Sequence, residues 1–235
     1  TITVFKANPN LQIFIEDVNY GNVFVINAVL TGVNNTPLTG NVVINIAGKN
    51  YTVNVVNGIG TLAGDKLAAG SYEFTASWAG NDNYNSANCS SRFFVNKVDS
   101  SISVDVDDII VGEDAVVNVI LPSDATGDVI ITVNNENYTV AIVNGKAVKK
   151  ISGLGVGNYN VTVKYGGDNN YNGVTNIVGF KVSKINPEMN VSIEDIVFGQ
   201  ELAIVINMPS DATGSVVVTV DGKKYTLKIV NGKAT

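Results

Sequence analysis

Residues 71–78 read Ser-Tyr-Glu-Phe-Thr-Ala-Ser-Trp, so every second side chain is apolar and those between are polar. Strict alternation of this kind places one face of a strand in a core and the other in water. Residues 158–165, Asn-Tyr-Asn-Val-Thr-Val-Lys-Tyr, alternate in the same phase with different side chains. Agreement in phase without identity predicts that both stretches are the same strand of a repeated β domain.

A long internal repeat organises the rest of the chain. Pro-Ser-Asp-Ala-Thr-Gly occurs at 122–127 and at 209–214, a spacing of 87 residues, and Val-Asn-Gly-Lys-Ala recurs at the same spacing. A unit of this length is a whole domain, too long for one turn of a solenoid. The repeat predicts the last strand of a preceding domain at 1–6, complete domains at 7–97 and 98–184, and the N-terminal half of a third domain at 185–235.

Within the second copy, alternation and turn residues predict seven strands, at 101–106, 114–121, 128–133, 138–143, 146–151, 158–165 and 177–183. Asn144-Gly145 predicts a hairpin between the fourth and fifth strands, and Asp221-Gly222 predicts one between the third and fourth strands of the third copy. Seven short strands of this kind predict an antiparallel β-sandwich. Two successive hairpins would make a meander, so the sheet that holds the fourth strand stays open.

Composition limits the functions of this chain. Of its 235 residues 45% are hydrophobic, enough to fill several cores, and only 15% are charged. The formal net charge is −6, so nucleic acids and anionic membranes would be repelled. No apolar run approaches the roughly 18 residues of a membrane span, so we expect no membrane insertion within this segment. The chain has no histidine, and its one cysteine, Cys89, excludes an internal disulfide.

Several motifs recur in one order along the repeat. They are Glu16-Asp-Val-Asn-Tyr-Gly21 with Glu194-Asp-Ile-Val-Phe-Gly199, the Leu-x-x-Gly-x-Tyr segments that end at Tyr72 and Tyr159, and Gly167-Asp-Asn-Asn-Tyr171. Together they resemble the bacterial-type Ig-like repeats of large cell-surface proteins, especially the adhesin-like proteins of methanogenic archaea. The resemblance covers nearly the whole chain. It implies an all-β fold of tandem Ig-like antiparallel β-sandwiches with about seven strands each.

Two kinds of site residue follow. The Leu-x-x-Gly-x-Tyr segments are similar to the tyrosine corner of Ig-like domains, which implies that the Tyr72 and Tyr159 hydroxyls bond backbone a few residues upstream; we expect both rings to be largely buried. Asn-x-Ser/Thr sequons occur at Asn34, Asn50, Asn88, Asn137, Asn160 and Asn190. Asn50 and Asn137 share one place in the repeat and are the better candidates for N-glycosylation if the chain is secreted.

Carboxylates gather where domains should meet. The groups expected at the first joint are Glu16, Asp17, Lys97, Asp124 and Asp168, and those at the second are Asp107, Asp108, Lys184 and Asp211. We expect the lysine and water to satisfy each cluster, with no cofactor. The alternative is a Ca²⁺ ion that bridges the carboxylates at the domain junctions. The segments 80–84 and 167–171 lack the path to a bidentate Glu that a calcium loop needs, and they predict turns instead.

These patterns predict a non-catalytic structural stalk of a cell-surface adhesin-like protein, extracellular, which projects a terminal head from the cell surface. Its expected partners are other domains of the same surface protein. The alternative is an adhesion module that binds host or neighbour-cell glycans or proteins through exposed loops. The paired carboxylates Asp107 and Asp108 recur in the copies, but no second polar group nearby keeps the same place in each copy. That pattern favours a junction role over acid–base chemistry, so we expect no enzyme activity.

Overall fold

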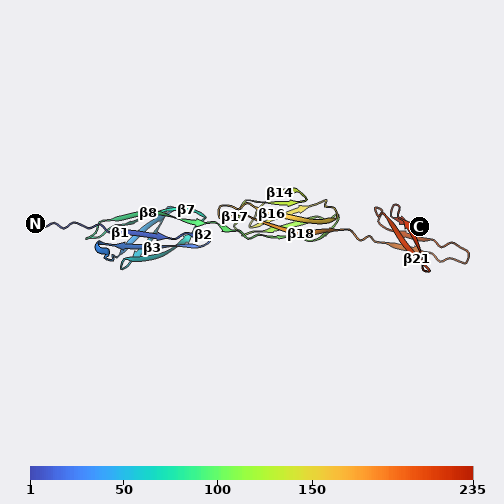
Figure 1. Cartoon of the computed structure of the whole chain (residues 1–235), viewed down its shortest axis with the longest axis horizontal. Helices are drawn as coiled ribbons and strands as arrows, with labels where there is room; N and C mark the ends of the chain where they lie inside the picture. Colours follow the sequence, from blue (N-terminus) through green and yellow to red (C-terminus); the bar gives the residue numbers. More distant parts are fainter. Residues whose placement is uncertain (235) are drawn as a thin grey trace. The chain divides into compact units, whose positions relative to one another are not determined.

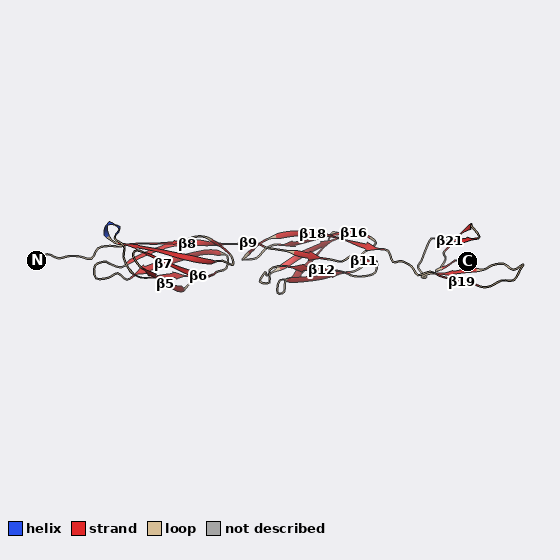
Figure 2. Cartoon of the chain, turned by 90° about the horizontal axis from the view of Figure 1, so that it is seen from below, coloured by secondary structure: helices blue, strands red, loops and turns tan. Residues whose placement is uncertain are grey.

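The structure of residues 1–234, a computed structural model, is all-β. Its complete sandwiches consist of two facing sheets, as Figures 1 and 2 show. By the density of internal contacts the chain divides into two compact units. The first comprises Thr1–Asp107, Asp114–Ser152 and Asn158–Phe180, and the second comprises Asp108–Glu113, Gly153–Gly157 and the chain from Lys181 on.

The first sandwich pairs a three-stranded sheet with a five-stranded sheet. In spatial order the three-stranded sheet contains β1 (Asn10–Ile15), β3 (Val23–Thr31) and β6 (Ile59–Lys66). The five-stranded sheet contains β2 (Val18–Asn19), β8 (Ala87–Asn96), β7 (Gly70–Trp78), β4 (Gly40–Ile46) and β5 (Lys49–Val55). A short 3₁₀ turn, Val33–Asn35, lies between β3 and β4. Phe24, Ile26 and Leu30 of β3 are fully buried, because alternate residues of a strand share one face.

The second sandwich repeats this arrangement. Its three-stranded sheet contains β10 (Ser103–Asp105), β12 (Ala115–Ile120) and β15 (Lys146–Ile151). Its five-stranded sheet contains β11 (Ile109–Ile110), β18 (Val174–Ser183), β16 (Gly157–Tyr165), β13 (Asp128–Val133) and β14 (Glu136–Ala141). A separate parallel pair joins β9 (Val98–Asp99) to β17 (Tyr171–Asn172). Val161, Val163 and Tyr165 are buried, as Phe74, Ala76 and Trp78 are in the first sandwich. The predicted phase of this strand is therefore confirmed in both copies.

The fourth strand of the repeat lies beside the third. β14 pairs antiparallel with β13, and β5 pairs in the same way with β4. The fourth strand therefore belongs to the five-stranded sheet, which answers the question that the sequence left open. In both sandwiches it is the outermost strand of that sheet, so one of its sides pairs with no other described strand.

The Asn144-Gly145 turn differs from the prediction. It has the expected left-handed geometry, with φ of 51° and 72°, and Val143 bridges Lys146 across it. The flanking strands β14 and β15 nevertheless lie in different sheets, so they form no paired hairpin. Instead, β15 pairs antiparallel with β12 along its whole length. The N–H of Leu121, just after β12, donates to the Gly145 carbonyl at 2.8 Å and extends this pairing to the turn.

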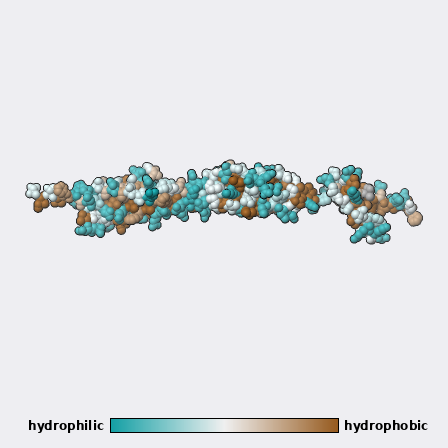
Figure 3. Space-filling view, turned by 45° about the horizontal axis from the view of Figure 1, so that its top comes forward, coloured by the Kyte–Doolittle hydropathy of each residue, from teal (hydrophilic) through white to brown (hydrophobic). Residues whose placement is uncertain are grey.

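The chain from Lys181 on contains the first strands of a third copy. They are β19 (Asn190–Ile193), β20 (Ile204–Asn207) and β23 (Lys233–Ala234) in one sheet, and β21 (Ser215–Val220) with β22 (Lys223–Lys228) in another. Asp221-Gly222 closes the predicted hairpin between β21 and β22. Val218 and Val220 are only half-buried, whereas Ile131 and Val133 at the same repeat positions are buried. Figure 3 shows hydrophobic side chains at the surface of this part.

The predicted domain limits are not decided by these sheets. Residues 1–6 form no strand in the structure, and their assignment to a preceding domain remains a prediction, as do the other boundaries. Within the described residues, no helix is long and apolar enough to cross a membrane.

Candidate functional site: the joint between the first two sandwiches

Each complete sandwich is preceded by a short segment that is bonded to one of its own turns. Residues 6–8 and 97–99 are called the incoming linkers here. Residues 80–85 and 167–172 are called the F–G turns, because each joins the sixth and seventh strands of its sandwich. Both pairs of segments lie in the first compact unit.

The second incoming linker is held by its main chain and by two side chains. β9 runs parallel to β17, as one short strand added to the F–G turn. The amide nitrogen Nδ2 of Asn172 donates to Oδ1 of Asp99 at 2.8 Å. The ammonium group of Lys97 donates to the carbonyl oxygen of Asp168 at 2.6 Å. Hydroxyl Oγ of Ser100 donates to the Asn172 carbonyl at 2.8 Å, which fixes the end of the linker.

The first incoming linker repeats the parallel main-chain pairing, the side-chain bond at its third residue and the lysine bond. Ala7 forms a parallel bridge with Tyr84. Nδ2 of Asn85 donates to Oδ1 of Asn8 at 2.8 Å, and Lys6 Nζ donates to the Asn81 carbonyl oxygen at 2.8 Å. Two linkers with different sequences are thus bound by one arrangement, which makes linker docking a property of the repeat.

The F–G turns are stabilised by a side chain at their second position. Oδ1 of Asn81 accepts the N–H groups of the residues two and three positions later, both at 2.9 Å. Oδ1 of Asp168 accepts the equivalent groups at 2.8 and 2.9 Å. The preceding residues, Gly80 and Gly167, have φ of 87° and 83°, a region that favours glycine. The sequence correctly predicted turns at these two segments.

The second F–G turn also meets the first sandwich. Tyr20, which follows β2, donates its hydroxyl to Oδ2 of Asp124 at 2.6 Å, and Tyr171 donates to Oδ1 of the same carboxylate at 2.8 Å. The rings of Tyr20 and Tyr171 make an edge-on contact with centroids 5.6 Å apart. Nearby, the N–H of Ala69 donates to Oδ1 of Asn170 at 3.0 Å. The Asp124 carboxylate of the second sandwich therefore accepts one tyrosine hydroxyl from each sandwich, and the Tyr20 bond links the two.

The electrostatics agree with this geometry. The bond from Tyr20 lowers the pKa of Asp124 from its ordinary value, and the same bond raises the pKa of Tyr20. Burial, followed by the bond to Asp124, raises the pKa of Tyr171 to about 12. Burial would raise the pKa of Asp168, but backbone N–H groups, that of Thr126 first, lower it to about 2. Near neutral pH both carboxylates accept and both tyrosines donate.

The expected cluster around Lys97 is found in part: Lys97 lies at the loop that contains Asp168, as predicted. Lys97 binds a backbone carbonyl, while Asp17 accepts the N–H of Phe94 in its own sandwich at 2.8 Å. Both carboxylate oxygens of Asp124 and of Asp168 accept hydrogen bonds from protein donors. Among the described residues, no group of three or more His, Cys, Asp or Glu side chains could hold a metal ion.

The two corner tyrosines occupy equivalent surroundings. The Tyr72 hydroxyl donates to the carbonyl oxygen of Ala68, four residues upstream, at 2.9 Å. Its ring stacks on Phe93 at 5.7 Å, and Tyr159 stacks on Phe180 at 5.5 Å. Both tyrosines are half-buried, and each ring lies against a buried phenylalanine of its core.

The candidate glycosylation residues are not among the residues that form the joint. Asn50 is in β5 and Asn137 in β14, both exposed and both on the outermost strand of their sheet. Sequence reasoning did not identify the contact between Tyr20 and Asp124. One signal was available, because Asp124 belongs to the Pro-Ser-Asp-Ala-Thr-Gly motif that recurs at 209–214.

Comparison with known proteins gives fold-level similarity only. No family model matches the chain, and no curated protein matches it. Among solved structures, the titin domains Z1Z2 in complex with telethonin are 13% identical and cover 78% of this chain and 100% of theirs, with a TM-score of 0.41. The Yersinia pseudotuberculosis adhesin InvE is 14% identical and covers 97% of this chain and 74% of its own, with a TM-score of 0.39. The fibronectin(III)-like modules of Clostridium thermocellum CbhA are 15% identical, with 74% and 95% covered and a TM-score of 0.32. Similarity at this level does not bear on function.

Proposed function

We propose that this chain is a non-catalytic spacer segment of an extracellular, cell-surface adhesin-like protein, in which tandem Ig-like sandwiches hold a terminal head away from the cell surface. A spacer needs joints that keep neighbouring domains at a set distance. The low charge and the absence of histidine suit a structural segment that binds no polyanion.

The docked incoming linker is the observation that carries this proposal. A free linker would let neighbouring sandwiches reorient, since a short flexible chain has many conformations. Here Lys97, Asp99 and Ser100 are each bonded to the F–G turn of the sandwich that follows. The bonds from Tyr20 to Asp124 and from Ala69 to Asn170 then connect that sandwich to the preceding one. Residues of the recurring sequence motifs, among them Tyr20, Asp124 and Asp168, therefore form this joint.

Distance measurements between spin labels test the joint. In a Cys89→Ser background, labels at Asn41→Cys and Lys164→Cys place one probe on each of the first two sandwiches, at exposed strand positions. We expect a narrow distance distribution that broadens in Tyr20→Phe combined with Asn170→Ala. Tyr138→Phe is the matched control, because it removes a tyrosine–carboxylate bond, to Glu136, away from the joint. A broad distribution in the parent protein would contradict a spacer role.

A binding assay separates the spacer from an adhesion module. The purified segment should show no saturable binding to host or neighbouring cells, while protease treatment of intact producing cells should cleave it at the surface. Saturable binding that is lost on changing exposed loops would favour the adhesion module instead. A segment that proteases cannot reach on intact cells would contradict the surface location.

A further inference from the structure

We propose that Asn50 and Asn137 carry N-linked glycans that cover the open edges of the two five-stranded sheets. This inference rests on the proposed extracellular location, because N-glycosylation takes place on exported chains.

The argument begins with the edges. β5 and β14 are the outermost strands of their sheets, so each presents one row of N–H and C=O groups without a strand partner among the described residues. An open edge of this kind can pair with the edge of another molecule. Proteins at high local density on a surface are especially exposed to such pairing. Natural sheets block it with lysine, proline, bulges or a covering group.

The three copies of the repeat fill one edge position in two ways. Asn50 lies opposite Asn45, Asn137 lies opposite Thr132, and in the third copy Lys224 lies opposite Thr219. The first two positions begin sequons, Asn50-Tyr-Thr52 and Asn137-Tyr-Thr139. The third is a lysine, the charged residue that most often protects an edge strand from pairing with another molecule. A glycan and a lysine ammonium would both put a strongly hydrated group beside the edge strand.

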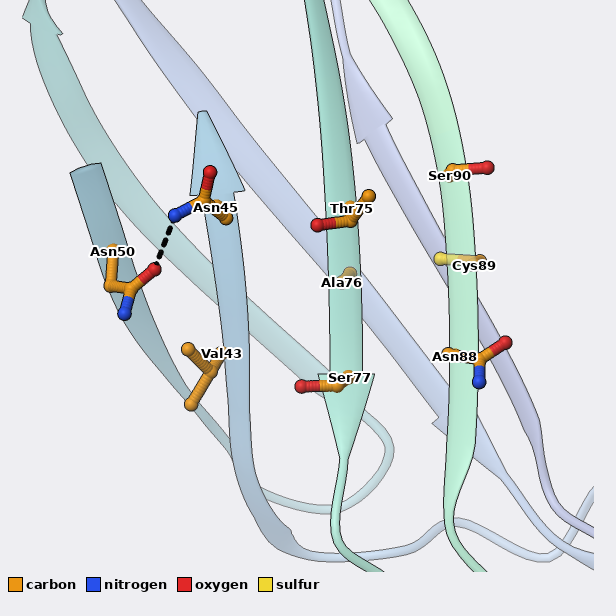
Figure 4. A pocket seen from close by; sticks show the side chains of 9 residues that line it. All are labelled: Val43, Asn45, Asn50, Thr75, Ala76, Ser77, Asn88, Cys89 and Ser90. Atoms are coloured by element: carbon orange, nitrogen blue, oxygen red, sulfur yellow. Dashed lines mark hydrogen bonds between the residues drawn. The ribbon is translucent and has the colours of Figure 1, made fainter. Parts of the chain in front are cut away.

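The folded sheet leaves the attachment atom of both acceptor side chains outside the cross-strand hydrogen bonds. Oδ1 of Asn50 accepts Nδ2 of Asn45 at 2.6 Å, and Oδ1 of Asn137 accepts Oγ1 of Thr132 at 2.7 Å. Figure 4 shows the Asn50 oxygen turned toward Asn45 and its nitrogen turned away. Within the described chain, neither amide nitrogen donates a hydrogen bond. A glycan attached to Nδ2 would leave both of these cross-strand bonds intact.

The surface next to Asn50 suits a sugar. A shallow hollow of about 470 Å³ is lined by Asn45, Asn50, Thr75, Ser77, Asn88 and Ser90, together with Val43, Ala76 and Cys89 (Figure 4). Its hydroxyl and amide groups can hydrogen-bond sugar hydroxyls. Asn88, the second sequon on this face, lines the same hollow. A glycan on Asn50 would therefore lie beside groups that can hydrogen-bond it.

The attachment step is redox-neutral. Nδ2 of the asparagine forms a bond to the anomeric carbon of a sugar carried on a lipid diphosphate, the carbon–oxygen bond to the diphosphate breaks, and the lipid diphosphate leaves with the electron pair. The amide nitrogen loses one proton in the exchange. Since the backbone of both sequons is paired on one side in the folded sheet, transfer should precede folding.

Glycopeptide mass spectrometry of the protein purified from its native host tests the attachment. We expect peptides with Asn50 and Asn137 to carry a glycan mass, and Asn50→Gln with Asn137→Gln to lose it. Thr52→Val with Thr139→Val keeps both asparagines and should lose the same mass. Unmodified asparagines in the parent protein would overturn the proposal.

Self-association tests the role of the glycans. By sedimentation velocity the parent should be monomeric, and both sequon variants should form dimers or larger species at the same concentration. Asn50→Lys with Asn137→Lys, which copies Lys224, should lack the glycans yet stay monomeric. Sequon variants that remain monomeric would overturn the covering role. Protease accessibility on the same cells separates the two proposals. If proteases reach the protein but its asparagines carry no glycan, only the glycosylation proposal is contradicted. If proteases cannot reach the protein, the proposed surface spacer is contradicted.

Discussion

The F–G turn of the first sandwich contains Asn81 where that of the second contains Asp168, and the two turns are otherwise bonded alike. In both, Oδ1 accepts two backbone N–H groups of the turn. Only Asp168 has a second acceptor. Its Oδ2 accepts the N–H of Thr126 at 2.9 Å and the Thr126 hydroxyl at 3.0 Å. In the first sandwich, Thr39 at the same repeat position instead accepts the N–H of Asn57 at 3.2 Å.

The difference between Asn81 and Asp168 shows that this turn residue has two separate roles. Closing the turn needs a single amide or carboxylate oxygen, which either residue supplies. The lysine of the linker binds the main-chain carbonyl of this residue in both turns, so it does not depend on the side chain. Tying the turn to the loop before β13 needs the second oxygen of a carboxylate, because the NH₂ group of an asparagine cannot accept. That loop carries Asp124, which meets Tyr20 of the preceding sandwich. The carboxylate therefore supports the joint as well as the turn.

The largest effect is expected where the turns are alike. A Cβ on Gly80 would lie 2.7 Å from the Tyr84 carbonyl oxygen, and one on Gly167 would lie 2.6 Å from that of Tyr171. Because both glycines also have positive φ, Gly80→Ala and Gly167→Ala should each destabilise their sandwich by about 3 kcal/mol, measured by urea unfolding. Gly153→Ala is the control, since its φ is 76° but no atom lies near the added Cβ; a cost as large there would contradict the steric argument.

A smaller effect should distinguish the two turns. Asp168→Asn removes the second acceptor and should cost about 1–2 kcal/mol at pH 7 after solvent screening, whereas Asn81→Asp should change stability little. The pKa of Asp168 is lowered from 3.8 to about 2. Its contribution is therefore complete above about pH 4, and it declines as the pH falls from about 4 to 2. Urea unfolding across this range should show the decline in the parent and a flatter profile in Asp168→Asn.

The smallest effect concerns a feature that both sandwiches share. Tyr72→Phe removes the hydrogen bond to Ala68 from a half-buried ring and keeps the stacking on Phe93. We expect a loss of about 1 kcal/mol, and a similar loss for Tyr159→Phe, by thermal unfolding. Equal losses would support equivalent corners in the two copies. No loss in either variant would argue against a structural role for the hydroxyls.

Much of the fold could be predicted from local sequence. The phase of residues 71–78 and 158–165 was predictable, since period two directly marks the face that is buried. The turn at Asp221-Gly222 was predictable as well, because these residue types tolerate positive φ. The Asn144-Gly145 turn shows the limit of this reasoning. Its local geometry was correct, but the strand after it pairs with β12 in the opposite sheet, a contact that the turn residues do not encode.

The buried face of the strands, the positions of the turns and the repeat of one domain can all be read from the amino-acid sequence, because each depends on neighbours within a few residues or on direct comparison of copies. The folded chain was needed to show that the fourth strand forms the sheet edge, that the incoming linkers bind the F–G turns, and that Tyr20 meets Asp124. Tyr20 and Asp124 are 104 residues apart in sequence. Contacts at such separation arise when preformed surfaces fit together, and no local pattern encodes that fit.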